Sequence, residues 1–291
     1  MNFIFTVIIP TFQRPGFTKI ALDSVLNQTC ISYEIIVCDD SLDSSIKNLI
    51  NEVNYKNIKY FQNNKQLGVA LNIKKAITKA EGKFIAILND DDFWHPEWLE
   101  SVLKRLEIDD NSDLIFCDHW LVDANGNKLH TDTDLNTLHY KRNILKDTIP
   151  FSQACELYLN NSIPIAMGSV FRKSILDLND FPNEIDGAYD RWIMMQILSN
   201  TKNYIYYIPK RLTYYRVHSL SLTATQRTNN LIGLEFVLNR SIDRFKQHDC
   251  NKKIIYSYRG SLRTLIKAFI LDRQIVKAFS ILKKYILSFS K

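Results

Sequence analysis

The sequence predicts an α/β protein with a mostly parallel central sheet, helices on both faces of that sheet, and a helical C-terminal region. Through residues 1–120, apolar runs of strand length alternate with stretches that have helical spacing. The apolar runs are continuous, which is typical of strands that a parallel sheet buries on both faces. From about residue 226, apolar residues recur at helical spacing. These three observations predict a sheet-forming half, a mixed region and a helical region, in that order.

Five strands and four helices account for the first 120 residues. The predicted strands are residues 3–10, 33–38, 58–62, 83–88 and 114–117. Between them, apolar residues recur every three or four positions, which predicts helices at residues 17–26, 45–53, 69–80 and 97–106. Because each strand is followed by a helix, we expect the strands to be joined by crossover connections in a parallel sheet.

The pattern loosens between about residues 125 and 225. A helix is expected after Asp190, and strands are expected at 204–208 and 212–217. Few glycines and prolines are present, so long flexible linkers are not expected. The predicted organisation is one domain with two halves and a helical region after it, at residues 1–225 (1–120 and 121–225) and 226–291.

The net charge of +6 is unevenly distributed along the chain. Residues 251–291 hold ten Lys or Arg and a single acid, Asp272, so this segment carries +9 and the rest of the chain −3. A protein that binds nucleic acid more often spreads its positive charge over a groove or a recognition element. We therefore expect no nucleic acid partner.

Three features predict a cytoplasmic protein. No apolar stretch approaches the roughly 20 residues that a transmembrane helix needs. The apolar run at residues 3–9 lacks a basic flank and ends at Pro10, so we interpret it as a first strand and not as a signal peptide. The five cysteines are odd in number and lack CxxC spacing, which indicates reduced thiols and no zinc site.

Polar residues follow three of the predicted strands, at the edge where parallel sheets bind ligands. Thr11 follows the first strand, Asp39 and Asp40 follow the second, and Asp90–Asp92 follow the fourth. Asp39 and Asp40 could accept hydrogen bonds from a base or ribose, or could begin a turn or helix. Three adjacent carboxylates repel one another without a counter-charge. The cluster indicates a divalent metal, Mg²⁺ or Mn²⁺, that carries a diphosphate, with a solvated acidic loop as the alternative.

Five distinctive segments follow one another within residues 4–225. They read TVIIPTFQR (6–14), SVLNQT (24–29), EIIVCDDS (34–41), NKQLGVALN (64–72) and AEGKFIAILNDDDFWHP (80–96). In order and spacing they resemble the family 2 glycosyltransferases. The resemblance implies a GT-A fold, with a nucleotide-sugar-binding first half, an acceptor-binding second half and a divalent metal.

The resemblance also implies roles for particular residues. It assigns nucleotide-sugar contacts to Thr11, Asp39, Asp40, Asn72, Asp90 and Arg216, and metal contacts to Asp91, Asp92 and His218. The metal signature of the family usually reads Asp-x-Asp-Asp, whereas this chain has Asn89 at the first position, so the set of ligands stays open. A lone histidine at the end of a strand is alternatively structural.

Asp190 stands where a helix is expected to begin. In the family, an acid in this place resembles the general base that takes the proton from the acceptor hydroxyl. The alternative is a helix N-cap, which stabilises a helix by about 1 kcal/mol. Asp186 and Glu184 are the next candidates for the base.

Two amphipathic helices are predicted over residues 261–289, with a turn near 271–273. Their polar faces hold six cations: Arg263, Lys267, Arg273, Lys277, Lys283 and Lys284. Such a face suits an anionic membrane surface. It equally suits a cap on the catalytic domain or a dimer contact. Peripheral attachment at the inner face of the membrane is therefore left open.

The resemblance implies an inverting enzyme that transfers a sugar from a nucleotide-diphosphate sugar, with a UDP-sugar as the first choice. The acceptor would be a glycan or a lipid-linked glycan in surface polysaccharide biosynthesis. One alternative is a sugar-nucleotide nucleotidyltransferase. Such an enzyme would normally have a Gly-rich, basic loop after the first strand, and residues 11–16 of this chain match that loop poorly. The other is a non-catalytic sugar-nucleotide-binding assembly protein that works through its basic tail.

Overall fold

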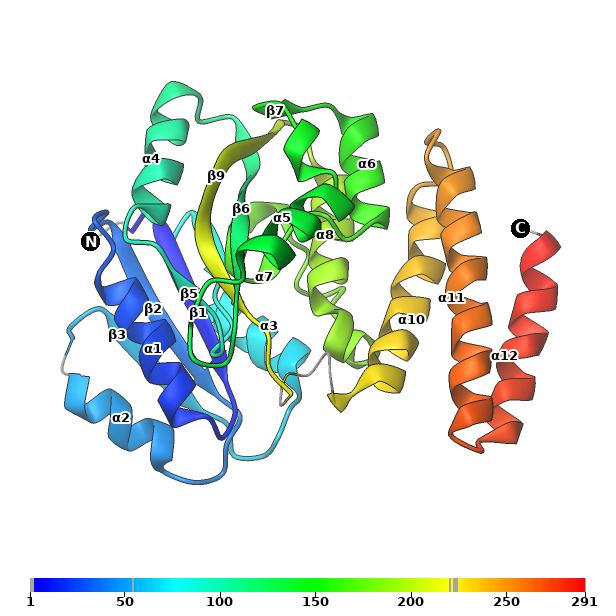
Figure 1. The fold of residues 1–291 in the computed structure, drawn as a ribbon, viewed down its shortest axis with the longest axis horizontal. Helices are drawn as coiled ribbons and strands as arrows, with labels where there is room; N and C mark the ends of the chain where they lie inside the picture. Colours follow the sequence, from blue (N-terminus) through cyan, green and yellow to red (C-terminus); the bar gives the residue numbers. More distant parts are fainter. Residues whose placement is uncertain (1–2, 54, 220, 222–224, 291) are drawn as a thin grey trace.

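The computed structural model describes residues 3–53, 55–219, 221 and 225–290. Its centre is one nine-stranded sheet (Figure 1). In chain order the strands are β1 (Phe5–Thr11), β2 (Tyr33–Asp39), β3 (Ile58–Gln62), β4 (Phe84–Ile87), β5 (Phe93–Trp94), β6 (Ser112–Val122), β7 (Thr148–Ile149), β8 (Ser169–Arg172) and β9 (Tyr204–Arg216). Across the sheet the order is β3-β2-β1-β4-β8-β6-β9-β5, and β7 also pairs with β9.

Most of the long strands point the same way and end at a common edge. β1 is parallel to β2 and β4, and β3 is parallel to β2. β8 is antiparallel to both β4 and β6, so β4 and β6 share one direction, and β9 is parallel to β6. β1 and β2 are buried along their whole length, as their continuous apolar sequences predict. The prediction of a mostly parallel sheet is confirmed.

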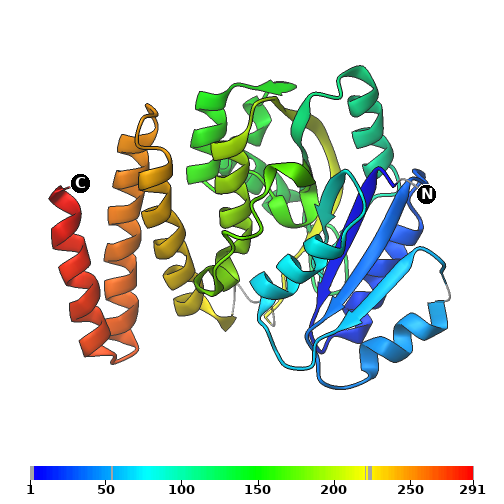
Figure 2. The ribbon, with the colours of Figure 1, turned by 180° about the vertical axis from the view of Figure 1, so that it is seen from behind.

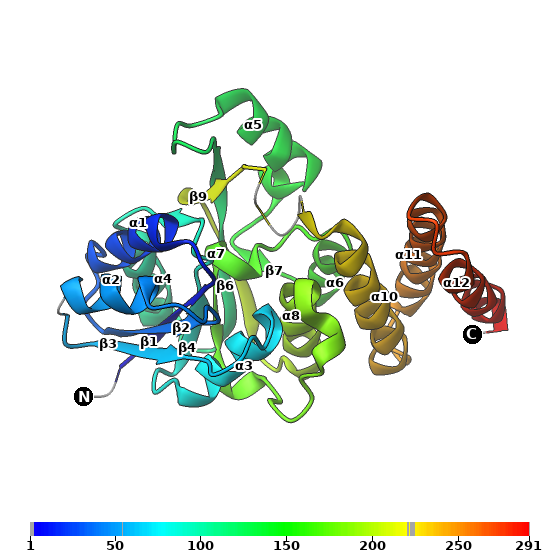
Figure 3. The ribbon, with the colours of Figure 1, turned by 90° about the horizontal axis from the view of Figure 1, so that it is seen from below.

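Helices cover both faces of the sheet (Figure 3). One face packs against α1 (Pro15–Leu26), α2 (Ser45–Val53) and α4 (Trp98–Ile108). The other packs against α3 (Val69–Lys79), α6 (Phe151–Leu159) and α8 (Tyr189–Asn200). Between the later strands lie α5 (His130–His139), α7 (Ile165–Gly168) and the 3₁₀ helices η1 (Arg142–Ile144), η2 (Lys173–Ile175) and η3 (Asn183–Ala188). The two faces carry separate hydrophobic cores, so the sheet is packed on both sides.

Three helices follow the sheet and lie side by side (Figures 1 and 2). α10 (Arg227–Arg244) packs on α8 and η3, α11 (Asn251–Leu271) packs on α10, and α12 (Ile275–Leu287), followed by η4 (Ser288–Ser290), packs on α11. The helical C-terminal region and its turn near 271–273 agree with the prediction. Within the residues that the structure describes, no helix has the length and hydropathy to cross a membrane.

The second half of the sheet differs in detail from the prediction. The sequence predicts two strands at 204–208 and 212–217, whereas the structure has the single strand β9. The ladder between β6 and β9 shifts register around Asp118, and this irregularity accommodates the polar residues that separate the two apolar runs. β5, β7 and β8 have only two to four residues each, too few for a periodic signal.

Candidate active site

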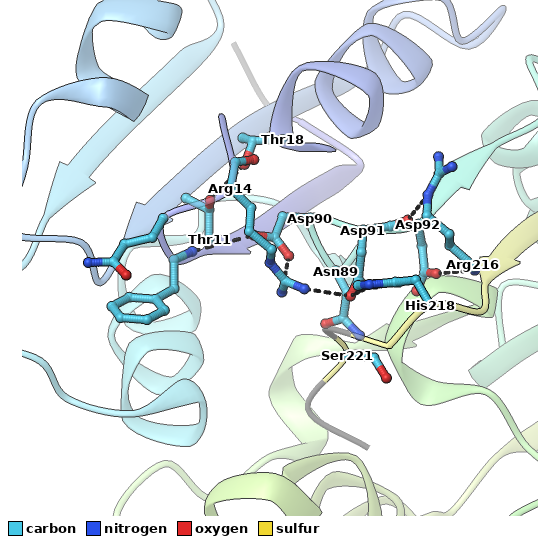
Figure 4. A network of polar contacts seen from close by, with 12 residues as sticks. Thr11, Arg14, Thr18, Asn89, Asp90, Asp91, Asp92, Arg216, His218 and Ser221 are labelled. Carbon is cyan, nitrogen blue, oxygen red and sulfur yellow. Dashed lines mark hydrogen bonds and ion pairs between the residues drawn. The ribbon is translucent and has the colours of Figure 1, made fainter. Parts of the chain in front are cut away.

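The acidic cluster Asp90–Asp92 lies just after β4, at the edge of the sheet where β1 also ends (Figure 4). Asp90 and Asp92 are each only 1% exposed. A guanidinium supplies counter-charge: Arg14, between β1 and α1, donates to Asp90 at 2.6 Å and to Asp91 at 2.8 Å. This role of Arg14 was not predicted, because an ion pair between residues so far apart in the sequence leaves no local pattern.

Burial dominates the protonation of two of these acids. It raises the pKa of Asp90 to about 7, against the opposing charge of Arg14. Burial and the neighbouring carboxylate of Asp91 raise the pKa of Asp92 well above its usual range. Oδ1 of Asp92 accepts a hydrogen bond from the main-chain N–H of Arg216 at 2.9 Å, whereas its Oδ2 has no partner among the described residues. A further cation would stabilise the ionised form of both acids.

A cavity of about 490 Å³ opens at this edge of the sheet. Its lining includes Thr11, Asp40, Asn72, all three aspartates of the acidic cluster, Asp190 and Arg216. Residues that precede the acidic cluster in the sequence and residues that follow it thus line the same cavity. The cavity therefore joins the predicted nucleotide end to the predicted acceptor end.

His218 lies directly beside Asp91 (Figure 4). Its Nε2 atom is 3.1 Å from Oδ2 of Asp91, and its ring packs at 5.1 Å from the ring of Phe17. Nδ1 has no hydrogen-bond partner in the part of the chain that the structure describes. Two of the three residues predicted to bind the metal, Asp91 and His218, are thus brought together from the acidic cluster and the segment just after β9.

Arg216 holds the acidic cluster in place through hydrogen bonds from its main chain and its side chain. Its Nε donates to the carbonyl oxygen of Asp91 at 2.8 Å, and its Nη1 donates to the carbonyl oxygen of Ala124 at 2.8 Å. The guanidinium also lies over the rings of Phe17 and Phe93, at 5.0 and 5.3 Å from their centroids. Its predicted contact with phosphate stays a prediction, because these contacts already hold much of the guanidinium.

The predicted nucleotide end is built by hydrogen bonds between β2 and the segment before α3. Asp40 accepts from the main-chain N–H groups of Leu67 and Gly68 at 2.8 and 3.0 Å. The side chain of Asn72 donates to the carbonyl oxygen of Cys38 at 2.8 Å. These bonds hold part of the cavity wall in place, and the predicted contacts of Asp40 and Asn72 with the nucleotide-sugar stay predictions.

Asp39 is oriented differently from its neighbour. Its carboxylate accepts from the main-chain N–H of Ser41 and from the hydroxyl of Tyr60, both at 2.8 Å. It is buried, and it is not among the described residues that line the cavity. Asp39 thus stabilises the loop after β2 through these hydrogen bonds. Its predicted contact with the nucleotide stays a prediction.

Asp190 lies in the first turn of α8 and lines the cavity. The N-cap position belongs to Ala188, so Asp190 is not the capping residue. Its Oδ1 accepts a hydrogen bond from the main-chain N–H of Arg191 at 2.7 Å, and burial raises its pKa. A carboxylate with a raised pKa is a stronger base than an ordinary one, which fits the predicted role.

The two reserve acids lie in different surroundings. Asp186 lines the cavity and accepts a hydrogen bond from the main-chain N–H of Ala70 at 3.3 Å. Glu184 is exposed. Asp186 also lies against Gly68, where an added Cβ atom would stand 2.7 Å from its Oδ1. Asp186 therefore links η3 to the segment at the start of α3, whereas Glu184 is not among the described residues that line the cavity.

A polar cluster from β6, α5 and η1 also lines the cavity. His119, Asn136, Tyr140 and Arg142 line it there. Arg142 is buried and donates through Nε to Asp118 at 2.7 Å. Burial lowers the pKa of His119 to about 3, so this imidazole is neutral at physiological pH. This cluster was not predicted, because its members come from separate elements that only the fold brings together.

The donor atoms of the site suit a divalent cation. Oδ2 of Asp91 and Nε2 of His218 converge, and Asp92 has an unpartnered buried oxygen among the described residues. Mg²⁺ commonly binds one or two carboxylates, with the remaining ligands from phosphates and water. No group of three or more potential protein ligands is preformed within the described residues. The residues therefore fit a metal that arrives with a diphosphate.

Comparisons with known proteins show the family and the fold of the chain. The chain matches the model of the family described as Glycosyl transferase family 2 over residues 6–178, which is more than half of its length. The chain therefore belongs to this family. The resemblance drawn from the five sequence segments is confirmed.

Several glycosyltransferases are similar in sequence. An uncharacterised glycosyltransferase of Rickettsia bellii is 29% identical over 241 residues, which cover 81% of this chain and 32% of the relative. The Escherichia coli enzyme WfgD, a UDP-Glc:alpha-D-GlcNAc-diphosphoundecaprenol beta-1,3-glucosyltransferase, is 26% identical over 125 residues, which cover 43% of this chain and 44% of WfgD. The matches thus span about a third to under half of these relatives.

Solved structures share the fold. Staphylococcus aureus TarS 1–349 in complex with UDP superposes with a TM-score of 0.63 at 21% identity, and the match covers 89% of this chain and 70% of TarS 1–349. The mannosyltransferase PcManGT from Pyrobaculum calidifontis, in complex with GDP-Man and Mn²⁺, gives a TM-score of 0.59 at 17% identity, with 98% and 84% covered. The predicted GT-A fold is confirmed.

Proposed function

We propose that this glycosyltransferase transfers a sugar from a UDP-sugar to a hydroxyl group with inversion at the anomeric carbon. One observation carries the proposal: a single cavity is lined by Thr11 and Asp40, by the acidic cluster and by Asp190. These are the residues expected to contact the nucleotide, the diphosphate and the acceptor, and an inverting displacement needs all three groups around one sugar. The solved complexes of TarS with UDP and UDP-GlcNAc support a uridine donor.

In the proposed reaction, Asp190 accepts the proton of the acceptor hydroxyl as its oxygen attacks the anomeric carbon. The new bond forms on the face opposite the leaving group, and the bond between that carbon and the diphosphate breaks, which releases UDP. Asp91, Asp92 and His218 would hold a divalent cation, Mn²⁺ or Mg²⁺, that neutralises charge on the departing diphosphate. Arg216 keeps the acidic cluster in place through its bond to the carbonyl oxygen of Asp91.

A lipid-linked glycan is the acceptor that we propose, in the synthesis of a surface polysaccharide by a cytoplasmic enzyme. The name of WfgD, whose acceptor is a diphosphoundecaprenol-linked sugar, supports this choice. The polar cluster around His119 and Arg142 supplies a wall that could hydrogen-bond to acceptor hydroxyls. The nucleotidyltransferase alternative has no comparable support, and its release of pyrophosphate would distinguish it.

The first experiment is a calorimetric titration of the purified chain with UDP, GDP and deoxythymidine diphosphate, with and without Mn²⁺. Binding of UDP that depends on Mn²⁺ is expected, and Asp91→Ala should abolish it. Asp23→Ala, which removes an exposed carboxylate on α1, is the matched control and should bind as the parent does. A preference for another nucleotide would change the donor class. A folded protein that binds none of them would overturn the proposal.

A further inference from the structure

A second groove, of about 600 Å³, lies between α10 and α11. Leu159 at the end of α6 and Arg191 in the first turn of α8 also line it. We call it the α10–α11 groove. Figure 1 shows α6, α8, α10 and α11 next to one another. The volume is typical of sites that hold small ligands, which measure about 300–1,000 Å³.

One side of the α10–α11 groove is apolar. Leu231, Leu234 and Leu238 recur at helical spacing along one face of α10, and Leu159 joins them from α6. Leu231 and Leu234 are half-buried, so they pack partly on the core and still line the groove. On the side of α11, a Cβ atom added at Gly260 would meet no atom within 4 Å. The groove is therefore open along a leucine-lined wall.

The α10–α11 groove also carries positive charge. Arg191, Arg263 and Lys267 line it, and its lining includes neither Asp nor Glu. Arg191 donates to the carbonyl oxygens of Tyr158 and Leu159, which are uncharged. Arg263 and Lys267 are exposed, and within the described residues none of the three cations forms an ion pair. An anionic ligand would therefore find three cations on the groove that no carboxylate neutralises.

The α10–α11 groove adjoins the cavity that holds the acidic cluster. Asp190 lines the cavity, and the next residue, Arg191, lines the groove. In the same way, Asn230 lines the cavity and Leu231 lines the groove. Burial raises the pKa of Asp190 and the charge of Arg191 opposes this rise, so the two side chains lie close together. A ligand that extends from the cavity into the groove would therefore pass the proposed base.

The combination of leucines and cations restricts the class of ligand. Inorganic phosphate would leave the leucines uncovered, and an uncharged lipid would leave the cations without an anion. An isoprenoid diphosphate satisfies both sides of the groove. Its phosphate oxygens accept charge-assisted hydrogen bonds from guanidinium groups, and its hydrocarbon chain covers apolar surface.

We propose that the α10–α11 groove binds the isoprenoid diphosphate of a lipid-linked acceptor. The diphosphate would lie at Arg191, Arg263 and Lys267, and the first isoprene units would lie on the leucines of α10. The inference rests on the proposed function in its choice of a lipid-linked glycan as the acceptor. Because the sugar of such a glycan is bonded directly to the diphosphate, a carrier held at Arg191 would place that sugar beside Asp190.

The test is a calorimetric titration of the full chain, in a chelator, with farnesyl diphosphate, farnesol and inorganic diphosphate. Farnesyl diphosphate should bind at least tenfold more tightly than the other two, because it alone meets both the cations and the leucines. Gly260→Leu places a side chain in the open groove and should weaken this binding at least tenfold without lowering the melting temperature. Arg263→Glu/Lys267→Glu should also weaken it at least tenfold.

Matched variants elsewhere separate this effect from general changes. Thr78→Leu adds a leucine at an exposed position of α3, and Lys47→Glu/Lys56→Glu reverses two other exposed charges. Both should bind farnesyl diphosphate as the parent does.

Three results would overturn the proposed groove ligand. They are no binding of farnesyl diphosphate, equally tight binding of farnesol or inorganic diphosphate, and undiminished binding by Gly260→Leu. A dimer in solution that Gly260→Leu dissociates would show that a second copy of the chain occupies the groove instead. UDP titration with Mn²⁺ tests the donor site separately, and Gly260→Leu should bind UDP as the parent does. Failure of the parent to bind any nucleotide would overturn the proposed function, whatever farnesyl diphosphate does.

Discussion

At the scale of single residues, Asp190 makes the sharpest prediction. Asp190→Asn keeps the size of the side chain but removes the base, so sugar transfer should fall by about 10²–10⁴-fold. Binding of UDP should stay unchanged, because the nucleotide end of the cavity is intact. The measurement is UDP release in the presence of an acceptor. Glu184→Gln, at the exposed reserve acid, is the control and should keep the parental rate; equal losses in both variants would contradict the assignment.

Asp90 should make stability depend on pH. Its pKa in the folded protein is about 7, above the ordinary value of 3.8, so the folded state holds a proton that the unfolded state releases. This contribution is fully present below about pH 4 and is lost as the pH rises through about 7. Relative to Asp90→Asn, the parent should lose on the order of 3 kcal/mol of unfolding free energy over that range.

Denaturant unfolding at a series of pH values, in the presence of a chelator, measures this difference. The chelator matters because a bound cation would hold Asp90 in its charged form. Parallel curves for the parent and Asp90→Asn would show that the carboxyl group of Asp90 ionises as it does in the unfolded chain.

Arg14 should compete with a metal for the same carboxylates. Removal of one partner of a buried ion pair leaves the other charge uncompensated. Arg14→Ala should therefore lower the melting temperature in chelator, and Mn²⁺ should restore it by more than it stabilises the parent. Lys19→Ala, which breaks an exposed pair with Asp23, should show neither effect. An equal response of the parent and Arg14→Ala to Mn²⁺ would contradict the idea.

Much of the site could be predicted at this scale, because motif positions are local. Asp91, His218 and Asp190 were named from the sequence, and all three line or adjoin one cavity. Two features could not be predicted, because they depend on contacts between distant parts of the chain. These are the ion pairs of Arg14 with two aspartates and the hydrogen bond between Asp39 and Tyr60. No pattern within a short segment reports such contacts.

At the scale of elements, Gly68 tests the junction before α3. It has φ +80°, and an added Cβ would stand 2.7 Å from Oδ1 of Asp186. Gly68→Ala should destabilise the protein by about 1–3 kcal/mol and weaken UDP binding, because Gly68 also donates to Asp40. Gly260→Ala, in α11 with no atom within 4 Å of the new Cβ, should instead stabilise by about 0.5–1 kcal/mol. Thermal melts of both variants measure the two stability changes, and UDP titrations measure the change in binding.

The elements that the sequence predicts well are those with a long apolar pattern. The parallel strands β1, β2 and β3 and helices α1–α4 lie within one to two residues of their predicted bounds. The later strands of the sheet were harder to predict from the sequence. β8 is only four residues long and lies antiparallel between β4 and β6. Its place depends on neighbours that are distant in the sequence.

At the scale of the whole molecule, the C-terminal helices should differ in how much the fold needs them. Val237 and Leu238 of α10 are fully or almost fully buried in the core that contains α3 and α8, whereas α12 buries only Ala278 and Ile281. A chain that ends at Leu271 should fold, with a modestly lower melting temperature. A chain that ends at Gln226 should expose the core and aggregate. Circular dichroism and light scattering report both outcomes.

The pairing of Arg14 with two aspartates has a consequence for the enzyme between turnovers. A site that releases a divalent ion together with its product would otherwise be left with bare carboxylates in a place that water reaches poorly. On the proposed function, the guanidinium of Arg14, which pairs with Asp90 and Asp91, would supply positive charge to these carboxylates whenever the metal has left. The carboxylates would then face a cation both before and after each turnover.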